Sequence, residues 1–328
     1  MEERSFGSRV LDLDCAAETE RIGRWLVESV ARTGRRGAVI AISGGIDSSV
    51  CAALAARALG PARVLGLLLP ERDSSISSTV LGRRVAEGAG IEYLVEDIAP
   101  TLEAIGCYRH RDAAIRNLFP EYDAGWKSKI AIASSMGGRL HYFKLIVQSP
   151  DGTVHEVRLP LKEYLEIVAA TNFKQRIRKT LEYFHADRLN YAVIGSPNRL
   201  EYDQGFFVKN GDGSADVKPI AHLFKTQVYA LARHLGIPDE ICTARPTTDT
   251  YSMTQGQDEF YFALPYEKMD LALWAHNHGV SAEELASQIG LSALEAATVY
   301  ADIKSKRRTT AHLHAGPVLV EPVLEISD

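Results

Sequence analysis

The chain has 328 residues, of which 46% are hydrophobic and 24% charged, and its formal net charge is −5. The composition is typical of a soluble globular protein, and the length suffices for one large α/β domain or for one domain with additions. The small acidic excess argues against a broad nucleic-acid-binding surface. No apolar run reaches the roughly 20 residues that a transmembrane helix needs, so we expect no membrane partner.

The cysteines and the N-terminus indicate the compartment. The four cysteines stand far apart and form no C-x-x-C pair, which disfavours a zinc knuckle or a redox dithiol. The first residues, Met1-Glu2-Glu3-Arg4, lack the basic and then apolar layout of a signal peptide. We therefore expect a reduced protein in the cytoplasm.

Strand and helix patterns alternate through the first third of the chain. We expect a helix over 15–32 because apolar residues recur there at helical spacing, with a buried face formed by Ile22, Trp25, Leu26 and Val30. The elements that follow are a strand over 38–42, a helix over 48–59, a strand over 64–69, a helix over 78–89 and a strand over 91–98. This order predicts an α/β fold with a doubly wound parallel sheet, whose ligand lies beyond the carboxyl ends of the strands.

The connection between the first strand and its helix has the residues of an anion site. It reads Ser43-Gly44-Gly45-Ile46-Asp47-Ser48-Ser49. A helix N-terminus presents unpaired N–H groups and the positive end of the helix dipole, and glycines let the backbone approach a ligand closely. The three serine hydroxyls add donors. Asp47 places a carboxylate beside the anion, which requires a cation between them, so the loop predicts a phosphate chain with Mg²⁺.

Neither of the commonest phosphate-binding patterns, G-x-x-x-x-G-K-[ST] and G-x-G-x-x-G, occurs in this loop. The loop resembles instead the pyrophosphate-binding sequence SGG(x)DS(S/T) of the N-type ATP pyrophosphatases. That superfamily includes the synthetases of NAD, GMP, asparagine and argininosuccinate. The resemblance implies the adenine nucleotide alpha hydrolase-like fold and cleavage of ATP between its α and β phosphates.

Residues 107–160 break the alternation. The segment Trp126-Lys127-Ser128-Lys129 precedes a predicted β-hairpin, with strands over 142–148 and 154–159 joined through Pro150-Asp151-Gly152. We interpret this region as an insertion into a single domain that spans 1–328. It could serve as a surface or dimer arm or as a lid over the substrate, and the sequence does not choose between these roles.

Regular α/β patterns return after the insertion. Asn172 is a candidate N-cap for a helix over 173–186. A short strand over 191–194 and helices over 226–235 and 266–278 follow. Ser281 with Glu284 and Ser292 with Glu295 have the spacing of capping boxes that open two C-terminal helices.

The second half of the chain carries polar motifs that should reach the same sheet edge. They are Gly195-Ser196-Pro197-Asn198-Arg199-Leu200-Glu201, then 205–216 (GFFVKNGDGSAD), 218–228 (KPIAHLFKTQV) and Arg245-Pro246-Thr247-Thr248-Asp249. In order and spacing they resemble motifs of the NAD synthetase family, as do 172–178 (NFKQRIR) and Lys306-Arg307-Arg308. The resemblance covers about 25–98 and 170–308 and does not extend over 107–160.

The resemblance implies a role for each matched residue. Residues Ser43 to Ser49 would cradle the ATP phosphates, and Asp47 and Glu201 would hold Mg²⁺ on the pyrophosphate. Asp47 and Lys225 are therefore the expected catalytic residues. The further expected contacts are Ser196, Lys225 and Thr247 with ATP, and Arg176, Lys209, Asp216 and Lys306 with deamido-NAD.

The family reaction also implies the partners. The nicotinate carboxylate of deamido-NAD attacks the α-phosphate of ATP, and ammonia then displaces AMP to leave the amide. The chain has no room for a glutaminase domain, so ammonia would come from solution or from a separate amidotransferase. The family resemblance further implies a homodimer.

Three other functions stay open. The late histidine of the family motif is Ser305 here, and with the insertion this leaves room for a ligase that amidates a different carboxylate. A tRNA-modifying thiolase of the same superfamily would need a reactive cysteine pair and a basic RNA surface, which the sequence does not show. A non-catalytic nucleotide sensor would not require both proposed Mg²⁺ carboxylates, Asp47 and Glu201.

Overall fold

The computed structural model describes residues 6–134, 141–244, 251–253, 256, 261–262, 264–321 and 323. Its centre is a parallel sheet of four strands in the order β3-β2-β1-β7. The strands are β1 (Ala38–Ala41), β2 (Val64–Leu68), β3 (Glu92–Val95) and β7 (Ala192–Ile194). All four predicted strands are present, and β3 ends earlier than expected because α4 (Ala99–Ala104) begins soon after it. In β1, Ala38 pairs with Val64 of β2 and Ala192 of β7.

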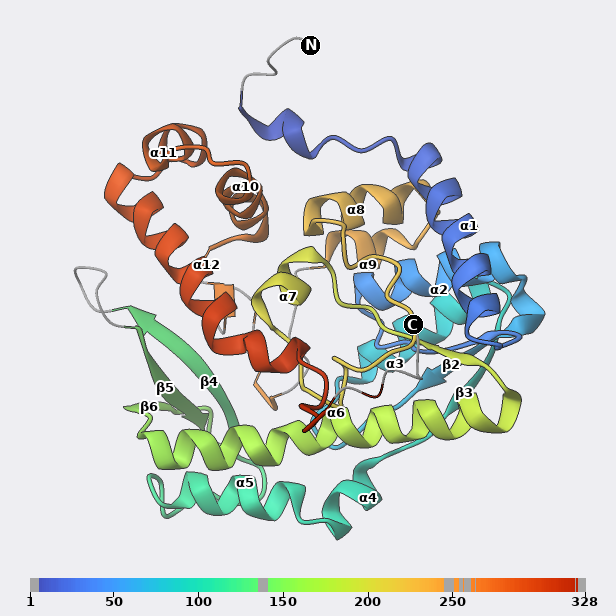
Figure 1. Ribbon diagram of the computed structural model, residues 1–328. Coiled ribbons are helices and arrows are strands. Elements are labelled where there is room, and N and C mark those ends of the chain that lie inside the picture. Colours follow the sequence, from blue (N-terminus) through green and yellow to red (C-terminus); the bar gives the residue numbers. More distant parts are fainter. Residues whose placement is uncertain are drawn as a thin grey trace.

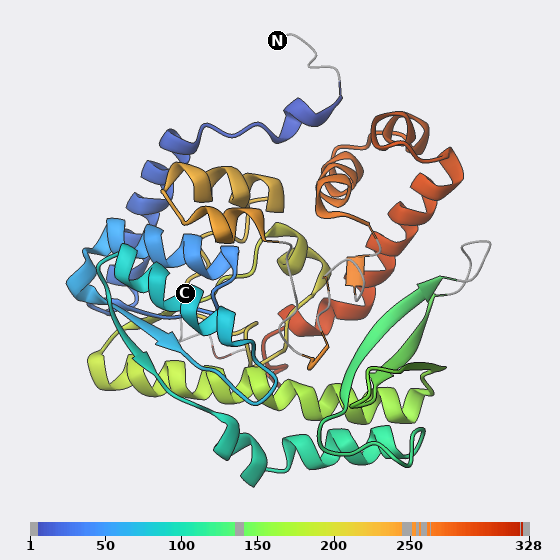
Figure 2. The same cartoon turned by 180° about the vertical axis from the view of Figure 1, so that it is seen from behind.

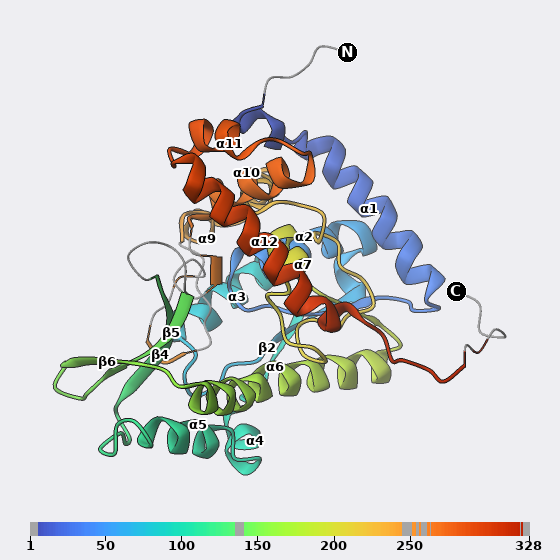
Figure 3. The same ribbon diagram turned by 60° about the vertical axis from the view of Figure 1, so that its left-hand side comes forward.

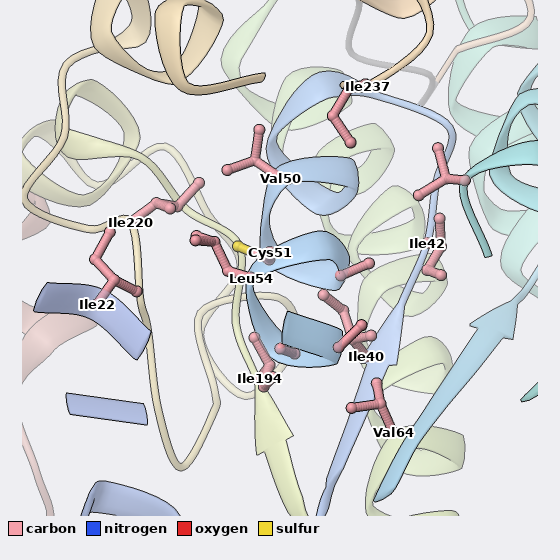
Figure 4. Close-up of a cluster of buried hydrophobic side chains, with 14 of the residues drawn as sticks. Ile22, Ile40, Ile42, Val50, Cys51, Leu54, Val64, Ile194, Ile220 and Ile237 are labelled. Atoms are coloured by element: carbon pink, nitrogen blue, oxygen red, sulfur yellow. The ribbon is translucent and has the colours of Figure 1, made fainter. Parts of the chain in front are cut away.

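One face of this sheet is covered by four helices. They are α1 (Cys15–Arg32), α2 (Ile46–Leu59), α3 (Ile76–Gly88) and α8 (Lys225–His234). Alternate strand residues point into this layer, and Ile40 and Ile194 pack there against Cys51 and Leu54 of α2 (Figure 4). The predicted bounds of α1 are confirmed, but Trp25 is 39% exposed and does not belong to its buried face.

The opposite face is covered by α4, α5 (Cys107–Arg116) and α6 (Leu161–Leu189). Val39 and Val193 point to this side, away from their neighbours Ile40 and Ile194. Figure 2 shows the strands between α2 and α3 on one side and α6 on the other. Helices on both faces of a parallel sheet confirm the predicted doubly wound α/β fold.

Helix α6 corrects one prediction. It is 29 residues long and begins directly after Pro160, so Asn172 lies inside it and does not cap a helix. The residues around Asn172 are buried at Ala170, Thr171 and Lys174. This burial favours a continuous helix over a break at the asparagine, because tertiary packing outweighs the preference of asparagine for caps.

A second sheet lies beside the first half of α6 (Figure 1). It is antiparallel in the order β4-β5-β6 and consists of β4 (Lys127–Ser134), β5 (His141–Gln148) and β6 (Val154–Arg158). The predicted hairpin is confirmed as β5 and β6, whereas β4 was not predicted. Ile130, Leu145 and Val147 form a small core here with Ile167 of α6 and Tyr251.

The C-terminal helices form a further layer, to which the N-terminal residues pack (Figure 3). It contains α10 (Tyr266–Asn277), α11 (Ala282–Ile289) and α12 (Ala293–His314). Ser292 forms the predicted capping box with Glu295, and Ser281 accepts the N–H of Glu284. The remaining described elements are the 3-10 helices η1 (Ser8–Leu11) and η2 (Pro61–Arg63), α7 (Arg199–Gln204) and α9 (Asp239–Thr243).

Membrane-spanning helices are not found in the described part of the chain, where every helix is too short or too polar to cross a bilayer.

Candidate active site

The order of the strands fixes where a ligand can approach. From β1 the chain moves outward to β2 and β3, and later returns to the other side of β1 to form β7. The connections after β1 and β7 therefore diverge and leave a crevice at the carboxyl ends of these two strands. The loop from Ser43 follows β1, and the segment from Gly195 follows β7. The structure thus brings the two main predicted motifs to one edge.

Helix α2 begins at this edge, and two glycines shape its entry. Gly44 has φ +80°, and a Cβ at this position would lie 2.3 Å from the carbonyl oxygen of Ser78. Both facts require glycine at position 44. Gly45 is the N-cap residue of α2, so Ile46, Asp47 and Ser48 supply the first N–H groups of the helix. These groups and the dipole favour an anion in front of the loop.

The serine hydroxyls of the loop bond mainly within it. Ser48 Oγ lies 3.2 Å from the Ser43 nitrogen and donates to the Gly45 oxygen at 3.1 Å. Ser49 Oγ donates to the same oxygen at 2.8 Å, and the Gly45 nitrogen donates to Ser43 Oγ at 3.2 Å. Ser48 and Ser49 are buried. Their hydroxyls hold the loop in shape, which leaves the backbone N–H groups of α2 to face an anion.

Asp47 joins the two motifs. Its Oδ1 accepts a hydrogen bond from Asn198 Nδ2 at 3.1 Å, and its Oδ2 is bound by the ammonium of Lys225. Asn198 in turn donates its backbone N–H to Glu201 Oε2 at 3.1 Å. The carboxylates of Asp47 and Glu201 were predicted as a pair from segments far apart in the sequence. In the structure both bind Asn198, which links them.

Lys225 is the cation of this cluster, and its side chain is 2% exposed. Burial disfavours the charged ammonium, but the carboxylates of Asp47 and Glu201 outweigh it and raise the pKa of Lys225. Behind the cluster, burial together with the same two carboxylates raises the pKa of the Cys51 thiol. The site therefore holds a charged lysine and a protonated cysteine at neutral pH.

Two residues of the cluster received no role from the sequence. Asn198 caps α7 with its side chain and binds Asp47. Its pattern, Asn198-x-x-Glu201, is a capping-box spacing and could have revealed it. Asp270 on α10 accepts the backbone N–H groups of Lys225 and Thr226. The only sequence feature that marks Asp270 is a carboxylate within an apolar helix face.

The predicted acceptor-binding residues lie elsewhere on the described surface. Arg176 Nε on α6 donates to the carbonyl of Lys209 at 3.3 Å. Lys209 Nζ donates to the carbonyls of His312 and Ala315, at 2.7 and 2.9 Å, at the end of α12. The structure therefore places Arg176 beside the Lys209 segment and holds the lysine ammonium on backbone oxygens.

Asp216 and Lys306 are also bonded to the protein. Asp216 Oδ2 accepts the Val193 N–H at 2.7 Å, on the side of β7 that faces away from β1. Lys306 Nζ donates to the Tyr261 carbonyl at 2.6 Å and to Asp302 at 2.7 Å. Ser196 follows β7 at the same edge as the phosphate loop, and Thr247 lies outside the described residues.

The donor set suits Mg²⁺ shared with a phosphate chain. In the described part of the chain no group of three or more histidine, cysteine, aspartate or glutamate side chains could hold a metal ion. Mg²⁺ usually binds one or two carboxylates and completes its shell with phosphate oxygens and water. Asp47 and Glu201 fit that pattern.

Comparison with known proteins agrees with the family resemblance of the motifs. The family model for NAD synthase matches residues 18–121 and 126–312, which include most of the region 107–160 for which the motifs gave no correspondence. An NH(3)-dependent NAD(+) synthetase of Rhizobium meliloti (strain 1021) is 56% identical over 322 residues, covering 98% of this chain and 96% of the relative.

Two solved structures share the fold. An NH3-dependent NAD synthetase from Campylobacter jejuni has a TM-score of 0.62 and 22% identity, covering 94% of this chain and 100% of that one. An NMN synthetase from Francisella tularensis has a TM-score of 0.64 and 21% identity, covering 95% of this chain and 100% of that one. The family-model match and the near full-length relative together show that the chain belongs to the NAD synthase family.

Proposed function

We propose that this protein is a ligase that makes NAD from deamido-NAD, ATP and ammonia. The observation that carries the proposal is the contact of Asp47 with both Asn198 and Lys225 at the start of α2. With Glu201 bonded to Asn198, this contact supports the proposal because it gathers two carboxylates and a buried ammonium at a helix N-terminus, where N–H groups favour an anion. Such a set stabilises a phosphate chain while one of its bonds is broken.

The first step activates the acceptor. An oxygen of the nicotinate carboxylate attacks the α-phosphorus of ATP, the bond to the β-phosphate oxygen breaks, and pyrophosphate leaves. The first N–H groups of α2 hold the pyrophosphate, and the Lys225 ammonium offsets the negative charge that grows on it. The free carboxylate is a poor acyl donor, whereas the mixed anhydride with AMP has a good leaving group.

The second step forms the amide. The ammonia nitrogen attacks the carbonyl carbon of the adenylate, the bond from this carbon to the AMP oxygen breaks, and the nitrogen loses a proton. Neither step needs a nucleophilic side chain, which agrees with a site made of N–H groups, carboxylates and one lysine.

Mg²⁺ would be held by Asp47 and Glu201, and when bound it would neutralise charge on the phosphate chain. Ser196 and Thr247 are further proposed ATP contacts.

The deamido-NAD contacts remain our proposal as well. Arg176 and Lys209 carry cations that suit the substrate pyrophosphate, and Lys209 would leave the α12 carbonyls to bind it. Asp216 could accept from a ribose hydroxyl. The ammonium of Lys306 lies on the Tyr261 carbonyl, so we propose that it orders the 261–262 segment beside the acceptor.

The wider setting follows from the same family. We propose a cytoplasmic homodimer that takes ammonia from solution or from a separate amidotransferase. Residues 107–160 would be an accessory arm of the single domain, and we assign it no role in the chemistry.

The test is to incubate the purified protein with ATP, Mg²⁺, ammonium and deamido-NAD and to follow AMP and NAD by chromatography. We expect one AMP for each NAD formed. Omission of deamido-NAD should abolish AMP formation, because the carboxylate is the nucleophile. No AMP or pyrophosphate with any carboxylate tested would point to a nucleotide sensor instead.

A second acceptor is tested in parallel. The NMN synthetase from Francisella tularensis has the same fold, and Ser305 replaces the late histidine of the family motif. Nicotinate mononucleotide should therefore be compared with deamido-NAD at equal concentration. A higher kcat/KM for the mononucleotide would move the assignment to a ligase for that carboxylate.

A further inference from the structure

The first turn of α8 is capped from another helix. Phe224 occupies the N-cap position, and its side chain offers no acceptor to the first N–H groups. Instead, Asp270 Oδ1 lies 3.2 Å from the Lys225 nitrogen, and Asp270 Oδ2 lies 2.7 Å from the Thr226 nitrogen. A carboxylate of α10 therefore stands at the positive end of the α8 dipole.

Burial of the Asp270 carboxylate carries a large desolvation cost. Asp270 is 0% exposed and sits in an apolar stretch between Met269 and Leu271. Burial raises its pKa to about 7, even though the two N–H groups act in the opposite direction. A serine or asparagine at position 224 would cap α8 without burying a charge. The helix end alone therefore does not explain the aspartate.

The residue that Asp270 holds explains it better. Lys225 is the first residue of α8, and it binds Asp270 through its backbone and Asp47 through its ammonium. A lysine ammonium stands at the end of a flexible four-carbon chain. Its position is therefore fixed only when the backbone of the residue is fixed as well. Positions near a reacting centre are sensitive to shifts of about 1 Å.

We propose that Asp270 is a positioning residue that fixes the start of α8, and thereby the ammonium of Lys225, at the phosphate site. The inference rests on the proposed function, because it takes Lys225 to stabilise the leaving pyrophosphate. Asp270 acts through Lys225 and is not a catalytic residue itself.

The main test compares Asp270→Asn with Ser281→Ala. The asparagine keeps the shape but accepts at only one oxygen, so it releases one of the two N–H groups. Ser281→Ala removes a cap of the same kind from α11 in the same layer, where Ser281 Oγ lies 3.1 Å from the Glu284 nitrogen. Both proteins are assayed well below their unfolding temperatures, and kcat is separated from KM for deamido-NAD.

We expect Asp270→Asn to lower kcat by roughly 10- to 100-fold, as for a small displacement of a catalytic group. The KM for deamido-NAD should change by less than about twofold, since ground-state binding of the acceptor does not use Lys225. Ser281→Ala should keep both constants. A folded Asp270→Asn enzyme with the kcat of Ser281→Ala would overturn the proposal.

A second variant loosens the same turn more gently. Gln227 Oε1 accepts the N–H of Phe224 at 3.0 Å, just before α8. Gln227→Ala should lower kcat by less than Asp270→Asn while KM for deamido-NAD stays constant. If Asp270→Asn does not fold, the kcat of Gln227→Ala tests the proposal instead. A Gln227→Ala kcat equal to that of Ser281→Ala would overturn the positioning role of the start of α8.

Amide hydrogen exchange supplies a readout independent of activity. The peptide over 224–228 should exchange faster in Asp270→Asn than in the wild type, and at the wild-type rate in Ser281→Ala. Unchanged exchange in Asp270→Asn would refute the role of Asp270. A wild-type protein that makes no NAD would refute the proposed function instead, so the two failures are distinct.

Discussion

The two proposed sides of the site, a phosphate side around Asp47 and an acceptor side around Lys209 and Asp216, differ in how their charged groups are held. On the phosphate side, Asp47 binds the side chains of both Asn198 and Lys225, which come from two other segments of the chain. On the acceptor side, Lys209 binds the carbonyls of His312 and Ala315 and Asp216 binds the Val193 N–H. The phosphate side is assembled from bonded side chains, whereas Lys209 and Asp216 on the acceptor side bind backbone groups.

This difference indicates on which side the charged groups must exchange their bonds when substrates bind. Mutually bonded charges in a buried site are already oriented and cost little to reorganise. Charges held on backbone groups must exchange those bonds for bonds to substrate, which lowers the net gain in affinity. We therefore expect substitutions on the phosphate side to affect kcat and substitutions on the acceptor side to affect KM.

The strongest test of this contrast is Asp47→Asn. It removes the negative charge that holds Lys225 and would hold Mg²⁺, so we expect kcat to fall on the order of 10³-fold. The fold should persist, because asparagine keeps the shape of the side chain. Circular dichroism checks the fold, and AMP release checks the rate. Near-normal turnover would exclude a metal role for Asp47.

The next prediction concerns the effect of the buried Asp270 carboxylate on the free energy of unfolding. Burial raises the pKa of Asp270 to about 7, whereas in the unfolded chain it ionises near pH 4. Between these values the folded protein binds the extra proton, so this group lowers the free energy of unfolding as pH rises, and its effect is constant above about pH 7. Lys225 and Thr226 on α8 supply the N–H groups that face Asp270, and the raised pKa of Lys225 keeps its ammonium charged over that range.

Asp270→Asn removes this titration. The unfolding free energy of the variant relative to wild type should therefore rise between pH 5 and pH 8, by on the order of 2–3 kcal/mol. Denaturant unfolding at the two pH values measures the difference. An equal difference at both would show that Asp270 titrates normally and that the phosphate side carries no such cost.

On the acceptor side, Lys209→Ala should raise the KM for deamido-NAD by about tenfold, the loss of one charge-assisted contact. The kcat should stay within about threefold of wild type, since Lys209 does not touch the phosphate loop. Ser281→Ala is a suitable control for general effects in the C-terminal layer. If Lys209→Ala left KM unchanged and greatly lowered kcat, the expectation that acceptor-side substitutions act on KM would be wrong.

The smallest effect is expected for Asp216→Asn. The carboxylate accepts the Val193 N–H at 2.7 Å, and asparagine can still accept there through its amide oxygen. Loss of the charge should lower the unfolding free energy by about 1 kcal/mol. If Asp216 also binds the substrate, KM for deamido-NAD rises severalfold, and thermal unfolding with steady-state kinetics separates the two contributions.

The sequence was sufficient for the parallel sheet and for the glycine turn between β1 and α2, because both depend on local patterns. Buried parallel strands are continuous apolar runs, and a loop that needs positive φ at Gly44 must show a glycine there. The pairing of Asp47 with Glu201 was expected only through the family motifs. Asn198 joins them across 151 residues, and such a distance leaves no local pattern.

The failures have physical causes too. Helix α6 packs Ile167 into the small-sheet core and Phe173 and Ile177 into the main core, so its apolar face shifts partway along and Asn172 resembles a cap. Strand β4 reads KSKIAIAS, with only two large apolar residues, and this weak strand pattern is stabilised by pairing with β5. Neither result follows from local preference, since both depend on tertiary contacts.

Helix α6 has a mechanical consequence. At 1.5 Å per residue its 29 residues make a rod of about 44 Å, and no glycine or proline interrupts it. Near its middle, buried Lys174 is pinned by Glu71 and Asp73, which follow β2. This buried ion pair ties the middle of α6 to the segment after β2. Arg176, two residues further along, is therefore held in place relative to the main sheet, and a shift of the β4–β6 sheet at the start of the helix would reach it only weakly.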